Sequence, residues 1–150
     1  MIKAIIVDDE KLSRNTLKKL LEIYCPDVEV IAESDNVASA TIQVMQLQPE
    51  LVFLDVAMPG KNGIDFLKEL DDIKFEVIFV TAHDKYILQA IRLAAVDYLQ
   101  KPVDGQQLIT AVSNAAKRII QKSANYQVKT LLHNMQLKIN QQEMQLCIPS

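Results

Sequence analysis

Residues 51–60 read LVFLDVAMPG, and the rest of the chain can be understood from this segment. Four apolar residues run directly into one carboxylate, Asp55, and a Pro-Gly turn follows. A short apolar run bounded by turn residues is typical of a strand that is buried on both faces of a parallel sheet. Asp55 would then lie where the strand ends, and ligands bind at the carboxyl ends of strands in open α/β sheets. Because an isolated buried carboxylate is unfavourable, Asp55 needs a cation, hydrogen-bond donors or a chemical role.

Apolar strand-like segments alternate with helical patterns along residues 1–122. We expect strands at 2–7, 28–32, 51–54, 77–80 and 96–99. Helical patterns cover residues 11–24, 64–70, 86–95 and 104–122, and Asp84 would cap the helix at 86–95. A further helical pattern begins after the capping residue Asp35 or Asn36 and ends before Pro49. This alternation predicts an α/β fold with a parallel sheet and helices on both faces. Right-handed crossovers favour a flavodoxin-like, doubly wound sheet of five strands in the order 2-1-3-4-5, with five helices.

Helical spacing also predicts which side chains face the core. For the first three helices these are Leu12, Leu17, Leu20, Leu21 and Tyr24, then Ala38, Ile42, Met45 and Leu47, and finally Ile64, Leu67 and Leu70 with Phe66 beside them.

The tail, residues 123–150, differs in composition from the rest of the chain. It is rich in Gln and Asn, with an apolar stripe at helical spacing, and residues 145–149 have the pattern of a new strand. We therefore predict a helical linker that leads toward a further domain. A coiled coil is the alternative for the stripe, which consists of Val128, Leu131, Leu132, Met135 and Ile139.

The composition of the 150-residue chain excludes several classes of protein. Apolar residues make up 49% and charged residues 23%, as in ordinary globular proteins. The formal net charge of −3 argues against a strongly basic, nucleic-acid-binding surface. Cys25 and Cys147 have no metal or redox spacing, so we expect reduced thiols. Because no apolar run reaches a membrane-spanning length and no signal peptide is apparent, we expect a cytoplasmic protein without membrane contact.

Four of the predicted strands end on the same edge of the sheet, and each end carries polar residues. These are Asp8 with Asp9, then Asp55, Thr81 and Lys101. Each has an ordinary interpretation when taken alone: a helix cap, a common strand residue or an exposed lysine. Together they predict a site.

The predicted site combines groups that suit phosphate chemistry. Clustered carboxylates repel one another unless a cation is present, and their oxygens suit Mg²⁺. A carboxylate can also act as a nucleophile and become an aspartyl-phosphate. Lys101 and the Thr81 hydroxyl would then donate hydrogen bonds to the phosphoryl oxygens, and the small Ala82 would leave the approach to Asp55 open.

These motifs together resemble the receiver domain of two-component response regulators over residues 1–122. The matching segments are Val7-Asp8-Asp9-Glu10, Asp55 with Met58-Pro59-Gly60 and Gly63, Thr81-Ala82, and Asp97-Tyr98-Leu99 followed by Lys101-Pro102. The resemblance implies a regulatory domain, phosphorylated on Asp55 by a sensor histidine kinase, whose only enzymatic activity is self-phosphorylation and self-dephosphorylation.

The resemblance also implies a role for each residue of the site. Asp9 would bind Mg²⁺ directly, Asp8 would bind it through water, and Asp55 and the backbone carbonyl of Ala57 would complete the protein ligands. Thr81 would be the switch hydroxyl with Ala82 beside it, Lys101 the phosphate-binding lysine and Tyr98 an aromatic residue that moves with Thr81. The Lys101–Pro102 peptide bond would be cis.

Residues 82–99 further resemble the receivers that precede LytTR-type DNA-binding domains. Phosphorylation would change the surface formed by the fourth helix, fifth strand and fifth helix. Its apolar residues either pair two receivers in a homodimer or belong to the core; they are Ile87, Leu88, Ile91 and Leu93, with Tyr98 and Val103. DNA would be bound only through an output domain that lies outside this chain. Residues 123–150 would be the linker to that domain.

Alternatives remain open for the function and for single residues. A Mg²⁺-dependent phosphohydrolase with an aspartyl nucleophile is the main rival, although haloacid-dehalogenase-type enzymes carry a second Asp where this chain has Ala57. A receiver-like module that is never phosphorylated would lack Asp9, Asp55 or Lys101, and a flavodoxin-like nucleotide-binding protein would need a Gly-rich loop. His83 either influences water attack on the phosphoryl group or is simply exposed, and Tyr98 is either a switch or a packed strand residue.

Overall fold

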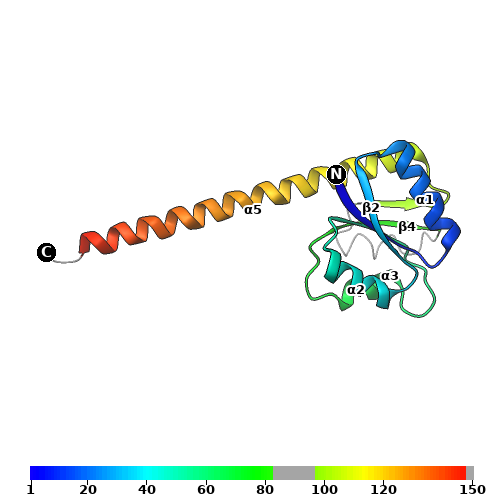
Figure 1. Cartoon of the computed structure of the whole chain (residues 1–150), viewed down its shortest axis with the longest axis horizontal. Helices are drawn as coiled ribbons and strands as arrows, with labels where there is room; N and C mark the ends of the chain where they lie inside the picture. The colour runs from blue at the N-terminus through cyan, green and yellow to red at the C-terminus, as the bar shows by residue number, and fades with distance from the viewer. Residues whose placement is uncertain (83–96, 148–150) are drawn as a thin grey trace. The chain divides into compact units, whose positions relative to one another are not determined.

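The protein forms a five-stranded sheet, and a computed structural model describes residues 1–82 and 97–147 (Figure 1). The strands are β1 (Ile2–Val7), β2 (Val28–Ser34), β3 (Leu51–Leu54), β4 (Glu76–Thr81) and β5 (Asp97–Gln100). They pair in the order β2-β1-β3-β4-β5, and every pair is parallel. The predicted fold class and strand order are therefore confirmed.

The helices cover both faces of the sheet. They are α1 (Lys11–Tyr24), α2 (Val37–Leu47), α3 (Gly63–Glu69) and α5 (Gly105–Cys147). Leu17 of α1 and Leu108 of α5 belong to the core on one face, whereas Ala40 of α2 and Phe66 of α3 belong to the core on the other. Alternate residues of β1, β3 and β4 supply the two cores, as expected for a doubly wound sheet. The helix predicted at 86–95 lies outside the described residues.

The central position of β3 in the sheet explains why its sequence is apolar throughout. Leu51 and Phe53 face the core beneath α1 and α5, while Val52 and Leu54 face the core beneath α2 and α3. All four are at most 1% exposed. A strand that is buried on both faces has no solvent side, so the alternation of polar residues seen in half-buried strands is missing.

Local capping sets where several helices begin. Asn36 caps α2 by accepting a hydrogen bond from the Ser39 amide at 2.8 Å. At α3, Asn62 and Asp65 form a reciprocal capping box, which sequence inspection missed. Asp104 accepts a hydrogen bond from the Gln107 amide at 3.1 Å, as expected for the start of α5.

The predicted inward face of α2 is wrong. Ile42, Met45 and Leu47 are exposed, Met45 by 71%, and Ala38 is exposed as well. The buried residues are instead Val37 and Ala40, with Val44 packed beside them. This helix carries apolar residues around most of its circumference, so periodicity alone does not select a face.

The predicted faces of α1 and α3 are largely correct. Leu17 and Leu21 are buried and Leu20 packs beside them, but Leu12 and Tyr24 are exposed at the two ends of α1. In α3, Phe66 is fully buried and belongs to the core instead of flanking it. Ile64 and Leu67 are buried, as predicted.

Helix α5 is longer than the sequence predicts. It continues to Cys147, so the strand predicted at 145–149 is wrong for residues 145–147, and residues 148–150 lie outside the described part of the chain. The chain divides into two compact units, Met1–Lys117 and Arg118–Ser150. In the described part of the chain, no helix combines the length and apolarity needed to span a membrane.

Candidate metal and phosphate site

Sheet pairing brings the predicted site residues to one edge. Val7 pairs with Leu54, and Leu54 pairs with Phe79, so Asp8 and Asp55 follow adjacent strands at the same level. The backbone hydrogen bonds continue one step beyond the strands: the Asp55 amide donates to the Val7 carbonyl (2.9 Å) and the Lys101 amide to the Thr81 carbonyl (2.9 Å). The sheet itself therefore fixes the backbone of the site.

Three carboxylates meet at this edge. Oxygen atoms of Asp8, Asp9 and Asp55 lie within 4.8 Å of one another. Asp8 and Asp55 are only 4% and 5% exposed, while Asp9 is half-buried. Such a set of hard oxygen donors fits Mg²⁺, which binds carboxylates and retains several water ligands. The residues present thus fit the predicted metal.

Lys101 links two of these carboxylates. Its Nζ atom donates to Asp8 Oδ2 at 2.8 Å and to Asp55 Oδ2 at 3.0 Å. The three acidic groups and this ammonium carry a formal charge of −2, which one divalent cation would neutralise.

Burial and charge act in opposite directions on the two central groups. Burial raises the pKa of Asp55, and the hydrogen bond and positive charge of Lys101 only partly oppose this effect. Burial lowers the pKa of Lys101, but its hydrogen bonds and ion pairs with Asp8 and Asp55 outweigh that effect and leave the pKa raised. Lys101 therefore stays an ammonium at neutral pH. A cation beside Asp55 would favour its ionised, nucleophilic form.

The loop after β3 is shaped around the Asp55 carboxylate. The Ala57 amide donates to Asp55 Oδ1 at 3.0 Å, which places the predicted metal ligand Ala57 next to the carboxylate. Gly63, at the start of α3, passes close to the loop: a Cβ atom there would lie 2.5 Å from the Asp55 carbonyl oxygen. Only glycine permits this approach. The Lys101–Pro102 peptide bond is cis, as the resemblance implies.

The remaining predicted residues lie at the ends of β4 and β5. Thr81 ends β4 and is buried, and Ala82 follows it on the surface. Tyr98 lies on β5 opposite Phe79, and 42% of its surface is exposed. His83 lies outside the described residues.

Sequence inspection missed two residues of α1 that contact the site. Ser13 Oγ lies 3.3 Å from Lys101 Nζ, and Arg14 Nη1 donates to the Asp8 carbonyl at 2.6 Å. The available signal was their position in the first turn of the helix that directly follows the Asp8-Asp9 pair.

The family of the chain follows from comparison with known proteins. The family model described as "Response regulator receiver domain" matches residues 4–113. The chain therefore belongs to the response regulator receiver domain family, in agreement with its fold and the polar edge of its sheet.

Individual relatives refine this assignment. "Sensory transduction protein LytT" from Bacillus cereus is 34% identical over 150 residues, which cover 99% of this chain and 59% of that protein. The protein of the same name from Bacillus subtilis is 42% identical over 110 residues, covering 72% and 45%. The chain thus spans about half the length of the curated relatives it matches.

A solved structure supports the fold independently. The REC domain of AraT, a response regulator from Geobacillus stearothermophilus, superposes with a TM-score of 0.73 at 28% identity, covering 81% of this chain and 98% of that one. The helical tail is the part of α5 that extends beyond the matched receiver family.

Proposed function

We propose that this receiver is a phosphorylation switch in which Asp55 accepts a phosphoryl group from a sensor histidine kinase. The observation that supports the proposal best is the contact of Lys101 with Asp55 Oδ2 (3.0 Å), beside the cluster of Asp8, Asp9 and Asp55. An oxygen of Asp55 would form the new bond to phosphorus while the bond from phosphorus to the donor nitrogen breaks.

Some residues of the site would bind the metal ion, and others would bind the phosphoryl group. Asp8, Asp9, Asp55 and the Ala57 carbonyl would hold Mg²⁺, which offsets the negative charge that collects at the reacting phosphoryl group. Lys101 would exchange its hydrogen bond with Asp55 for one with a phosphoryl oxygen, and Thr81 would supply a hydroxyl donor, with Ala82 leaving room beside it. The Tyr98 side chain would move together with Thr81, and this movement would change the surface formed by β5 and α5.

The output would be control of a further domain. Because the curated relatives are about twice as long as the matched region, we propose that the receiver acts on a DNA-binding output domain of the LytTR type. We further propose a receiver homodimer that forms on phosphorylation. The alternative, a phosphohydrolase, is disfavoured because Ala57 stands where such an enzyme needs its general acid. The proposed role is therefore regulatory, with no turnover of external phosphate esters.

Labelling with acetyl phosphate and Mg²⁺ tests the phosphoacceptor. The wild-type chain should gain one phosphoryl group by intact mass spectrometry, and Asp55→Asn should gain none. Asp71→Asn, which changes an exposed acid in the loop after α3, is the matched control and should label normally. Stoichiometric labelling of the Asp55→Asn variant would show that another residue accepts the phosphoryl group.

A further inference from the structure

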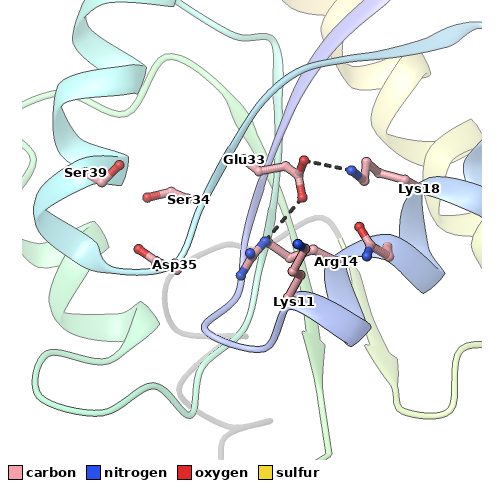
Figure 2. Close-up of a pocket in the computed structure, with 8 residues that line it drawn as sticks. Lys11, Arg14, Lys18, Glu33, Ser34, Asp35 and Ser39 are labelled. Atoms are coloured by element: carbon pink, nitrogen blue, oxygen red, sulfur yellow. Dashed lines mark hydrogen bonds and ion pairs between the residues drawn. The ribbon is translucent and has the colours of Figure 1, made fainter.

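One guanidinium connects helix α1 to the backbone of the acidic site. Arg14 Nη1 donates to the carbonyl oxygen of Asp8 at 2.6 Å, and Arg14 Nε donates to Glu33 Oε1 at 3.2 Å. Lys18 Nζ holds the other oxygen of Glu33 at 2.8 Å. These groups line a polar cavity of about 310 Å³ between α1 and the end of β2, where Figure 2 shows Arg14 and Lys18 reaching Glu33 from the same helix.

The bond to the Asp8 carbonyl matters because that oxygen belongs to the peptide group joining Asp8 to Asp9. Its orientation decides where the Asp9 side chain points relative to Asp8. The Asp8 amide is already tied to the Ser34 carbonyl at 3.0 Å, so Arg14 fixes the opposite end of the residue. The Arg14 side chain is only 14% exposed, and its second anchor, Glu33, lies on the neighbouring strand β2.

We infer that Arg14 is a positioning residue for the divalent cation: it holds the Asp8–Asp9 peptide in the orientation that lets both carboxylates bind one ion. This inference rests on the proposed Mg²⁺ site. It also opposes simple electrostatics, because a positive charge near a cation site should weaken cation binding. The two effects predict opposite outcomes when the guanidinium is removed.

Mg²⁺ titration by calorimetry distinguishes them. Arg14→Met keeps most of the side-chain volume and should raise the Kd for Mg²⁺ by about tenfold, the usual size of an outer-sphere contribution. Lys11→Met is the matched control: it removes a charge that lines the same cavity but lies outside the network of Arg14, Glu33 and Lys18, so the Kd of this variant should stay unchanged or fall. Arg14→Lys should also bind weakly, because an ammonium cannot hold Glu33 and the carbonyl as a planar fork does.

Two further measurements keep the test decisive. Thermal unfolding without Mg²⁺ establishes that each variant is folded. Glu33→Gln weakens the ion pair that anchors Arg14 but leaves Arg14 in place, so its Kd for Mg²⁺ should lie between those of the wild type and Arg14→Met. Equal or tighter Mg²⁺ binding by folded Arg14→Met would overturn the positioning role. Failure of the wild-type chain to bind Mg²⁺ would instead count against the proposed function itself.

A second, independent observation concerns the apolar stripe of the unit Arg118–Ser150. Val128, Leu131, Leu132 and Met135 lie on one face of the helix and are each 51% to 59% exposed. With Ala124, the residues Val128, Leu131 and Met135 follow the alternating four- and three-residue spacing of a coiled-coil seam. We propose that this stripe pairs in parallel with the same stripe of a second copy of the chain.

Side-chain shape at the seam favours a second copy as the occupant. With Val128 at position a and Leu131 at position d, the pair follows the β-branched and leucine preference of two-stranded coiled coils. The positions that flank this seam between residues 120 and 134 are uncharged: Ile120, Asn125, Gln127, Leu132 and Asn134. Lys122 and Lys129 fall at outward positions, and the apolar seam ends at Met135, before Lys138 at the next d position. Between residues 117 and 142 the helix carries five basic side chains and no acidic one, a pattern that would also suit an anionic membrane surface. The vesicle flotation described below distinguishes the two occupants.

Two leucines of the same helix provide a matched pair of variants. Leu131 lies in the seam and is 59% exposed, whereas Leu137 lies on the opposite side and is 49% exposed. Sedimentation equilibrium of the 150-residue chain should show concentration-dependent dimers that Leu131→Glu weakens at least tenfold and Leu137→Glu leaves intact.

The measurement is made in the Asp55→Asn background without a phosphodonor, so its outcome does not depend on the proposed phosphorylation. A monomer at all accessible concentrations, or equal effects of the two substitutions, would overturn the pairing. If a monomeric chain instead floats with phosphatidylglycerol vesicles, and Leu131→Glu abolishes the flotation, the stripe binds a membrane surface and the pairing is overturned.

Discussion

Replacement of Lys101 by methionine should expose how much the acidic edge depends on one ammonium. Lys101 forms ion pairs with both Asp8 and Asp55, whose side chains are each 6% exposed. Removal of one partner from a buried ion pair costs about 3–5 kcal/mol. Because the Lys101 side chain keeps 20% exposure, we expect the lower end, about 3 kcal/mol in the free energy of unfolding. For a chain of this size this corresponds to a fall in Tm of about 6–12 °C.

The pH dependence gives the sharper test. Without Lys101, burial and the charge of Asp8 raise the pKa of Asp55 further above its usual value. A carboxyl group with a higher pKa in the folded state binds its proton more tightly there. The deficit of Lys101→Met should therefore be largest at neutral pH and should shrink as the pH falls through the raised pKa.

Urea unfolding at pH 7 and pH 5, with and without Mg²⁺, measures both effects. Mg²⁺ should restore more stability to Lys101→Met than to the wild-type chain, because the ion no longer competes with the ammonium. Lys61→Met, which removes an exposed lysine paired with Glu69, is the control and should leave the unfolding curve unchanged. A deficit that is absent, or equal at the two pH values, would refute this view of the site.

Two further predictions test the frame around the site. Gly63→Ala should destabilise the fold by about 1–3 kcal/mol and slow acetyl phosphate labelling, because the new Cβ atom would collide with the backbone of Asp55. In the control Gly105→Ala, the new Cβ atom would meet the ring of Tyr24, which can turn away. Urea unfolding should therefore show a smaller loss of stability for Gly105→Ala than for Gly63→Ala. The hydrogen bond from Lys18, helped by Arg14, lowers the pKa of Glu33, so Glu33 stabilises the fold above its usual pKa and this contribution disappears as the pH falls through the lowered one. Unfolding curves of wild type and Glu33→Gln should accordingly differ at pH 7 and converge as the pH falls below the lowered pKa of Glu33, and a constant difference would contradict the assignment.

The strands and the composition of the site were predictable because both depend on patterns that are local in sequence. The apolar run Leu51–Leu54, bounded by turn residues, predicts a central strand, and parallel pairing then places Asp8 and Asp55 side by side. The contacts of Ser13 and Arg14 were not predictable in the same way. They depend on how α1 crosses the sheet, and no periodicity in the sequence specifies that crossing.

The errors have physical causes of the same kind. In α2 the apolar residues surround the helix, so the choice between Ala40 and Met45 as the buried residue was made by packing against the sheet. In the tail, residues 145–147 include the good helix formers Gln145 and Leu146, and the helix α5 continues through them. Packing against the sheet decided the first case, and propagation of an existing helix decided the second.

The backbone geometry also suggests how a change at Asp55 would reach the surface. The Lys101 amide donates to the Thr81 carbonyl at 2.9 Å, so the two proposed phosphate-binding residues are joined directly through their backbones. Lys101 Nζ simultaneously holds Asp8 and Asp55. If a phosphoryl group draws the Lys101 ammonium away from these carboxylates, the ends of β4 and β5 must respond together, because the link between Thr81 and Lys101 does not let one move alone. The proposed switch therefore needs no separate hinge: the last hydrogen bond of the sheet couples the modified residue to the edge strand that carries Tyr98.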